Sequence, residues 1–190
     1  YGIIGANGAG KSCLVRAIGR LQAMVIHGSL PPVASRDTNK YAGAKEPVTL
    51  EIEFKTGKGQ YSYGVSYRGN ICVEEWLYST KRTPKCIFER KRDNVTGKTK
   101  ITLLPTKKED AKNKMLVSLL EENILKSNEL LLSKYDVVKE AQMKDAYMWI
   151  VSQLHVIYPE THSTSIFDNR YTNPTFKQQS EKLIAALDLG

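Results

Sequence analysis

The feature that most constrains this fold is a glycine-rich segment close to the first residue. Residues 5–12 match the pattern G-x-x-x-x-G-K-[ST] at every fixed position. The apolar pair Ile3 and Ile4 precedes the segment. After it, apolar residues recur at the spacing of an amphipathic helix, at Leu14, Val15, Ile18, Leu21 and Val25. The sequence therefore predicts a strand, a tight loop and a helix that begins near Lys11.

The residue types of this loop suit phosphate binding. Glycines let the backbone wrap closely, so that N–H groups point at phosphate oxygens, and the following helix adds its positive end. In this reading Lys11 is the catalytic residue and supplies a cation to the β- and γ-phosphates, and the hydroxyl of Ser12 binds Mg²⁺. The predicted nucleotide-binding residues are Gly5, Ala6, Asn7, Gly8, Ala9, Gly10, Lys11, Ser12 and Cys13. The competing interpretation is a chance glycine-rich turn, with a structural role for Cys13.

The middle of the chain has a different period. From Val48 to about Leu104 apolar and polar residues alternate, and clusters of Gly, Asn and Thr interrupt the runs. The expected strands are 48–55, 60–67, 70–80, 85–92 and 99–104, and they predict an antiparallel meander with one packed and one wet face. Tyr61, Tyr63 and Tyr67 fit the packed face better than a base-stacking platform.

The remaining segments are predicted to be loop and helix. Residues 28–47 and 158–174 are expected to be loops. Two apolar stripes predict helices after Glu109, the first at Met115, Leu116, Leu119 and Leu120 and the second at Ala146, Trp149, Ile150 and Leu154. A last helix is expected over 176–187. The pattern divides the chain into residues 1–104 and a helical subdomain, 105–190.

The residues between the glycines carry a family resemblance. Asn7 to Ser12 resembles the Walker A motif of ABC-type ATPase heads, the group with ABC transporters, SMC proteins, RecF and OLD-family nucleases. The strand sequences 61–64, 73–78 and 87–90 are similar to the AAA_15/AAA_21-type group of ABC-like ATPases. That group includes ATPase subunits of Septu-type and retron-associated anti-phage systems. The resemblance covers roughly the first hundred residues.

The resemblance implies an α/β P-loop NTPase fold of the ABC-head type, of which the chain is the N-terminal half. It also implies that the full-length protein hydrolyses ATP with Mg²⁺ in a head-to-head homodimer or higher oligomer, and controls a nuclease or toxin effector. The alternatives are a nucleotide-gated scaffold with little hydrolysis and a DNA-repair or SMC-like DNA-binding ATPase.

Several parts of such a head are not evident in the sequence. Residues 183–188 superficially resemble a Walker B strand but favour an amphipathic helix, and no signature motif is present. Gln142 and Gln153 are weak candidates for the Q-loop glutamine of these heads, and a solvated helix position suits each better. The missing parts are expected beyond residue 190, so this segment alone is expected to be inactive.

Charge and composition limit the partners, metal sites and cellular location that we expect for the chain. Lys and Arg total 28 against 20 Asp and Glu, giving a formal net charge of +8 that favours anionic partners, DNA among them. The basic clusters are Lys81, Arg82 and Lys85; Arg90, Lys91 and Arg92; and Lys107, Lys108, Lys112 and Lys114. A solvated charged face is the slightly favoured interpretation of these clusters. The scattered Cys predict a cytoplasmic location and, with the isolated His, no metal site. The absence of a long apolar run predicts no membrane partner.

Overall fold

The computed structural model describes residues 10–31, 46–80, 83–103 and 111–157, and also residues 174, 177, 178, 181 and 182. The chain forms two compact units, Tyr1–Val156 and Ile157–Gly190. The five described residues after position 157 are helical, and four of them fall in the predicted helix 176–187. The predicted boundary between residues 104 and 105 stays a prediction.

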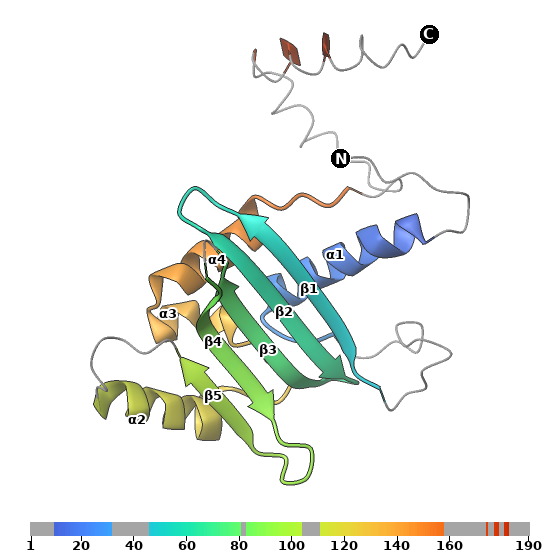
Figure 1. Ribbon diagram of the computed structural model, residues 1–190. Helices are drawn as coiled ribbons and strands as arrows, with labels where there is room; N and C mark the ends of the chain where they lie inside the picture. The colour runs from blue at the N-terminus through green and yellow to red at the C-terminus, as the bar shows by residue number, and fades with distance from the viewer. Residues whose placement is uncertain are drawn as a thin grey trace. The chain divides into compact units, whose positions relative to one another are not determined.

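The first unit contains five strands and several helical segments (Figure 1). The strands are β1 (Val48–Lys55), β2 (Gln60–Arg68), β3 (Ile71–Ser79), β4 (Lys85–Arg92) and β5 (Thr99–Leu103). The helical segments are α1 (Lys11–His27), α2 (Ala111–Leu119), the π-helical turn η1 (Leu120–Ile124), the 3-10 turn η2 (Leu132–Lys134), α3 (Tyr135–Val138) and α4 (Ala141–Ser152). The prediction of an α/β chain with five antiparallel strands is confirmed, and the strand ends differ from the predicted ones by no more than one residue.

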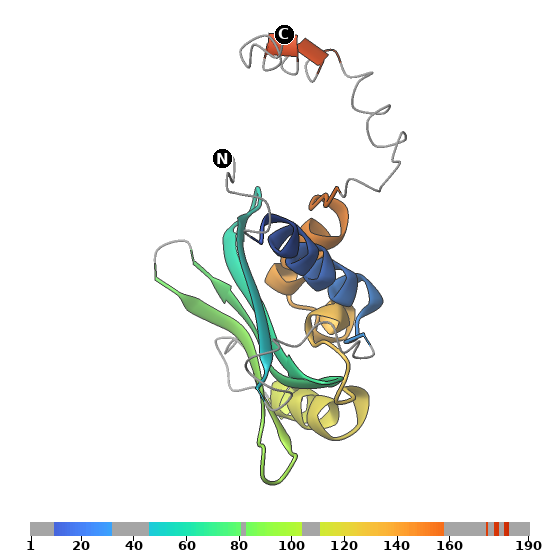
Figure 2. The ribbon, with the colours of Figure 1, turned by 90° about the vertical axis from the view of Figure 1, so that its right-hand side faces the viewer.

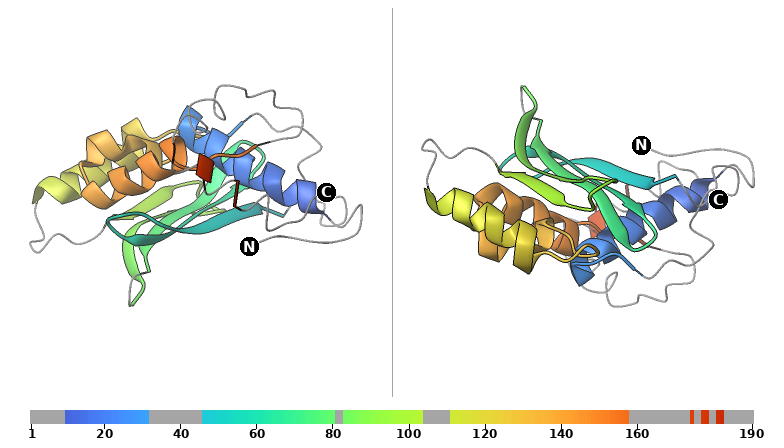
Figure 3. Two further views of the ribbon diagram at one scale, coloured as in Figure 1. Left: turned by 90° about the horizontal axis from the view of Figure 1, so that it is seen from above. Right: turned by 90° about the horizontal axis from the view of Figure 1, so that it is seen from below.

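The sheet and the helices form two layers. The strands lie in the order β1-β2-β3-β4-β5, and every neighbouring pair is antiparallel. Figures 2 and 3 show that α1 and the later helices cover the same face of the sheet. Tyr61, Tyr63, Val65 and Tyr67 point into this interface and are buried, as the packed-face interpretation predicts. The core therefore lies between the sheet and one layer of helices.

The opposite face of β2 is also buried, which corrects the expectation of a wet face along the whole sheet. The indole of Trp76 lies over Gly64, where a Cβ would come within 2.2 Å of it. The indole N–H donates to Glu51 Oε1 at 3.2 Å, and the hydroxyl of Ser62 donates to the same oxygen at 2.5 Å. An aromatic ring from β3 and a carboxylate from β1 thus cover the central part of β2.

A buried ion pair joins the sheet to the segment that precedes α3. Glu75 on β3 accepts hydrogen bonds from the backbone N–H groups of Leu131 and Leu132 at 2.6 and 2.9 Å. Arg90 on β4 lies 4.0 Å from Glu75 and donates to the backbone carbonyl oxygens of Lys126 and Glu129. Each half of the pair therefore bonds to backbone groups of residues 126–132 and ties this segment to the sheet.

Helix α4 is held against the sheet and α1 by polar and aromatic contacts. The ring of Trp149 stacks on Phe54 with centroids 4.3 Å apart. The carboxylate of Asp145 accepts from Thr56 Oγ1 at 2.6 Å and from the Tyr61 hydroxyl at 2.9 Å, which fixes the β1–β2 turn. The second predicted apolar stripe is thus on the packed side of α4.

Two predicted stripes are only partly buried. In α1, Leu21, Met24 and Val25 are buried, whereas Leu14 and Val15 are 46% and 37% exposed. Figure 1 shows the first turns of α1 extending past β1, which explains the difference. The stripe after Glu109 is interrupted because α2 changes to the π-helical turn η1, which leaves Met115 and Leu119 exposed and buries Leu120.

Candidate phosphate-binding site

The described part of the glycine-rich segment has the backbone of a loop that turns into a helix. Gly10 is left-handed, with φ 89° and ψ 4°, and α1 begins at the next residue, Lys11. The carbonyl of Gly10 accepts the first helical hydrogen bond, from the N–H of Leu14 at 3.1 Å. A Cβ on Gly10 would meet nothing within 4 Å, so the positive φ, and not crowding, requires glycine here.

The N-terminal end of α1 suits an anion. The first N–H groups of a helix have no intrahelical acceptors and carry a partial positive charge. The first turn of α1 contains no acidic residue, and no side chain caps it within the described residues. Lys11 is half-buried, while Ser12 and Cys13 are exposed on the same turn. Backbone donors, an ammonium group and a hydroxyl therefore lie together at one helix end.

The rest of the predicted nucleotide-binding set falls outside the description. Five of the predicted residues precede the first described one: Gly5, Ala6, Asn7, Gly8 and Ala9. The weak Walker B candidate, residues 183–188, follows the last described residue. The assignments of Lys11 as catalytic and Ser12 as a metal ligand stay predictions.

The two glutamine candidates differ in burial, since Gln142 is half-buried and its Oε1 has no hydrogen-bond partner within the described residues. Gln142 lies in the first turn of α4, where its backbone N–H donates to Glu140 Oε1 at 3.3 Å. Gln153 is exposed at the other end of the helix. The sequence analysis missed Gln22, whose side-chain Nε2 donates to the carbonyls of Ile150 and Leu154 at 2.9 and 2.7 Å. Gln22 is half-buried, and no local pattern marks its contacts because its partners lie more than 120 residues away.

Among the described residues of the basic clusters, one departs from the solvated face that the sequence predicts. Arg90 is 1% exposed and belongs to the buried pair with Glu75, which corrects its assignment to a charged face. Its neighbour Lys91 is exposed and lies 3.5 Å from Glu89. Lys85 and Lys114 are exposed, and Arg92 is half-buried. Residues 81, 82, 107 and 108 and the side chain of Lys112 lie outside the described part of the chain.

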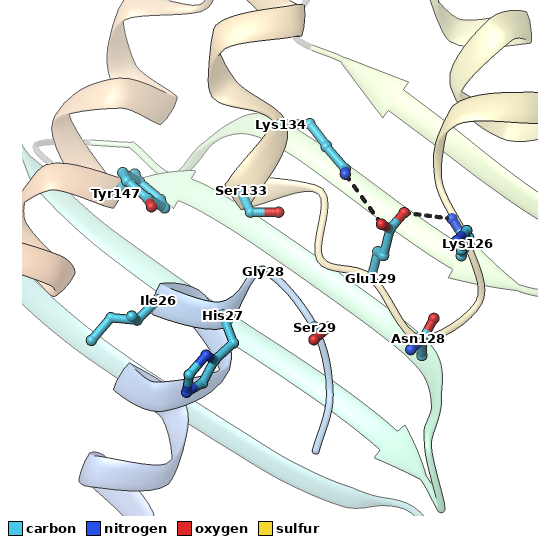
Figure 4. Close-up of a pocket in the computed structure, with 10 residues that line it drawn as sticks. All are labelled: Ile26, His27, Gly28, Ser29, Lys126, Asn128, Glu129, Ser133, Lys134 and Tyr147. Carbon is cyan, nitrogen blue, oxygen red and sulfur yellow. Dashed lines mark hydrogen bonds and ion pairs between the residues drawn. The ribbon is translucent and has the colours of Figure 1, made fainter. Parts of the chain in front are cut away.

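A polar pocket lies at the opposite end of α1 (Figure 4). It measures about 430 Å³, and its lining includes His27, Glu129, Ser133, Lys134 and Tyr147. The ion pair between Lys134 Nζ and Glu129 Oε1, at 3.3 Å, crosses it. The 17 residues of α1, at about 1.5 Å per residue, put roughly 25 Å between this pocket and the N-terminal end of the helix. The pocket is therefore separate from the predicted phosphate site.

Other predicted residues have no arrangement that suggests chemistry. His27 and His155 are exposed, and His162 lies outside the described residues. No group of three or more His, Cys, Asp or Glu side chains could hold a metal ion in the described ranges. Cys13, Cys72 and Cys86 are free thiols, and burial raises the pKa of Cys72 to about 12. A search of the described helices finds none long and apolar enough to cross a membrane.

Comparison with known proteins gives a family match. The sequence model of the AAA_21 family, described as "AAA domain, putative AbiEii toxin, Type IV TA system", matches residues 1–114 of the 190. The matched region contains the complete glycine-rich segment, α1 and all five strands. No curated protein and no solved structure matches the chain.

Proposed function

The chain belongs to the AAA_21 family, and from this premise we propose that it binds ATP with Mg²⁺ at residues 5–13. AAA domains are nucleotide-binding, ATPase-type domains, so the family supplies the class of activity. The observation that carries the proposal is the left-handed Gly10 directly before Lys11 at the start of α1. This is the backbone that a phosphate-binding loop needs where it enters its helix.

The proposed roles follow from the positions of three groups. The N–H groups at the start of α1 donate to phosphate oxygens, and Lys11 compensates the charge on the β- and γ-phosphates. The exposed hydroxyl of Ser12 holds Mg²⁺, which draws negative charge from the phosphates during transfer. The first turn of α1 carries no carboxylate, so no acidic side chain of that turn repels the phosphates.

The proposal extends to assembly and to control of an effector. In the resembling heads ATP is hydrolysed between two copies, and we propose the same head-to-head dimer or higher oligomer for the full-length protein. We further propose that its nucleotide state controls a nuclease or toxin in anti-phage defence. The family description, which names a toxin of a toxin–antitoxin system, supports an effector-linked role. The competing proposals are a nucleotide-gated scaffold that hydrolyses little ATP and a DNA-binding ATPase of the SMC type.

One experiment separates these proposals. ATP turnover is measured for the full-length protein and for Lys11→Ala, each with and without duplex DNA. The ATPase proposal predicts turnover that Lys11→Ala abolishes, and stimulation by DNA would support the DNA-binding version. If the wild type binds ATP but turns it over no faster than Lys11→Ala, the scaffold replaces the ATPase. If neither protein binds ATP, the phosphate site itself is wrong.

A further inference from the structure

The hairpin of β4 and β5 ends in a hydrogen-bonded loop, residues 93–98. The carboxylate of Asp93 accepts from the backbone N–H groups of Val95 and Thr96 at 2.8 and 2.6 Å. The backbone N–H of Asp93 donates to the carbonyl of Lys98 at 2.9 Å. Figures 1 and 2 show this loop projecting past the ends of the other strands. The hydrogen bonds thus fix the shape of a loop that stands out from one end of the sheet.

The side chain at the tip of this loop is apolar. Val95 is 94% exposed, more than any other large apolar side chain that the structure describes. Its neighbours Asn94 and Thr96 are polar and exposed as well. A partner that covers Val95 gains the burial of its side chain. A single exposed valine is ordinary by itself, so its meaning depends on the charges around it.

Basic side chains surround the tip. Residues 91–100 contain four basic side chains and one acidic side chain, namely Lys91, Arg92, Lys98, Lys100 and Asp93. Lys91 lies 3.5 Å from the carboxylate of Glu89, and the carboxylate of Asp93 accepts N–H groups of its own loop. The other three basic side chains form no ion pair with the residues that the structure describes. The end of the hairpin therefore carries a net positive charge that favours an anionic partner.

The register of the hairpin places two of these cations against each other. Lys91 on β4 is directly opposite Lys100 on β5. Like charges in opposite positions destabilise a strand pair. Glu74 on β3 lies opposite Lys91 on its other side and offsets part of this repulsion, whereas Lys100 lies on the last strand of the sheet. An anion bound over the hairpin would reduce the repulsion that remains.

The cations lie on both faces of the hairpin. Neighbouring residues of a strand point to opposite faces, so Arg92 is on the same face as the buried Arg90, and Lys91 and Lys100 are on the other. The guanidinium of Arg92 lies against Gly97, where a Cβ would come within 3.1 Å of it. A flat acidic surface would meet one face, whereas a groove between two phosphate backbones meets both. The major groove of B-DNA admits a two-stranded ribbon, and the narrow major groove of an RNA duplex does not.

We propose that the β4–β5 hairpin enters the major groove of double-stranded DNA with Val95 at its leading end. Arg92, Lys98 and Lys100 bind phosphates of the two strands, and Val95 makes apolar contact with base edges. This assignment rests on the DNA-binding version of the proposed function and gives that version a contact surface. Lys98 and Lys100 belong to none of the basic clusters that the sequence suggests.

Binding of a fluorescent DNA duplex of about 20 base pairs, roughly two helical turns, tests the hairpin. Fluorescence anisotropy gives the affinity between about 50 and 200 mM salt. Lys98→Gln with Lys100→Gln should weaken binding about tenfold and make the slope of log affinity against log salt shallower by about 1.8, because each phosphate contact contributes about 0.9. Lys58→Gln with Lys144→Gln removes two exposed lysines from the β1–β2 turn and α4 and should leave the slope unaltered. An unchanged affinity in the hairpin variant would overturn the proposal.

Val95→Ser separates the apolar contact from the charges. It should weaken duplex binding about fivefold without changing the salt slope, because losing an apolar contact alters no counterion release. A polyglutamate peptide, added as a competitor, should displace the duplex poorly. Full affinity in Val95→Ser, or displacement by polyglutamate as effective as by unlabelled duplex, would overturn the groove placement, and the latter result would assign the hairpin to an acidic protein.

Mg·ATP binding by the same proteins keeps this assignment apart from the nucleotide site. The hairpin variants should bind Mg·ATP as the wild type does, because their substitutions lie outside residues 5–13. A wild-type protein that binds Mg·ATP but no duplex at about 50 mM salt would contradict the hairpin assignment alone.

Discussion

Replacement of Arg90 by methionine tests the structural account most severely, because the sequence places this residue in a basic cluster and the structure buries it. In Arg90→Met the carbonyl of Glu129 loses the side-chain donor, the carbonyl of Lys126 keeps only the N–H of Glu129, and Glu75 keeps a buried carboxylate without its cation. Leaving a buried polar group unsatisfied costs about 1–3 kcal/mol, and removing one partner of a buried ion pair costs about 3–5 kcal/mol. Since the two estimates describe the same interactions, we expect a total loss of about 3–5 kcal/mol.

The variant should also respond differently to pH. Burial raises the pKa of Glu75, and Arg90 and the hydrogen bonds from Leu131, Leu132 and Tyr63 oppose that shift. A carboxyl group with a raised pKa in the folded state stabilises the protein below its unfolded pKa and loses this contribution as the pH rises through the folded pKa. Removing Arg90 raises the pKa of Glu75 further. The deficit of Arg90→Met should therefore be larger at about pH 8 than at about pH 5.

The assay is urea unfolding followed by tryptophan fluorescence, with Lys91→Met as the control. Lys91 is exposed beside Arg90, so its replacement should change the free energy of unfolding by no more than about 0.5 kcal/mol. The double variant Glu75→Gln with Arg90→Met removes the unpaired negative charge of Glu75 and should regain part of the lost free energy of unfolding. A deficit below about 1 kcal/mol for Arg90→Met, or one that is the same at both pH values, would refute the buried pair as an anchor.

Three further predictions concern the site, the thiols and a turn. Gly10→Ala should weaken Mg·ATP binding and lower the free energy of unfolding by about 1–2 kcal/mol, because the φ of Gly10 is 89°. Calorimetry measures the binding and urea unfolding the stability, and unchanged values of the two would contradict the left-handed loop. Iodoacetamide should label the exposed Cys13 well before Cys72, because burial raises the pKa of Cys72 to about 12, and Mg·ATP should slow the labelling of Cys13. Mass spectrometry measures the order of labelling, and a Cys13 rate that does not change with nucleotide would show that Cys13 lies outside the site. Hydrogen bonds from Thr96 and Val95 hold the pKa of Asp93 below its usual value, so the wild type should lose stability relative to Asp93→Asn as the pH falls through that lowered pKa. Melting temperatures of the two proteins that fall in parallel with pH would contradict this.

The strands could be predicted because their signals are local. Alternation of apolar and polar residues, interrupted by Gly-rich turns, marks each strand without knowledge of its neighbours. The signal for the segment from Gly10 to Ser12 is also local, because the left-handed glycine and the first residue of the helix are neighbours in the sequence. The same is true of the packed tyrosines of β2, because alternation alone puts them on one face.

The contacts that sequence analysis missed depend on pairing between segments that lie far apart in the chain. Arg90 follows a glutamate and precedes two basic residues, and nothing nearby shows that the register places it opposite Glu75. Likewise Gly64 and Ser62 look solvent-facing until the β2–β3 register brings Trp76 over the glycine. Gln22 binds carbonyls more than 120 residues away, as its separations of 128 and 132 residues show. Such contacts are fixed by tertiary packing and have no local signature.

The most direct measurement for the central claim is a titration of the 190-residue chain with Mg·ATP, followed by the amide resonances of α1. The account predicts large shifts at Gly10, Lys11 and Ser12, at the N-terminal end of the helix, and their loss in Lys11→Ala. Residues of the pocket at the other end, such as His27 and Ser133, serve as the internal control and should not shift. Shifts confined to that pocket, or no shifts at saturating nucleotide, would contradict nucleotide binding at the start of α1.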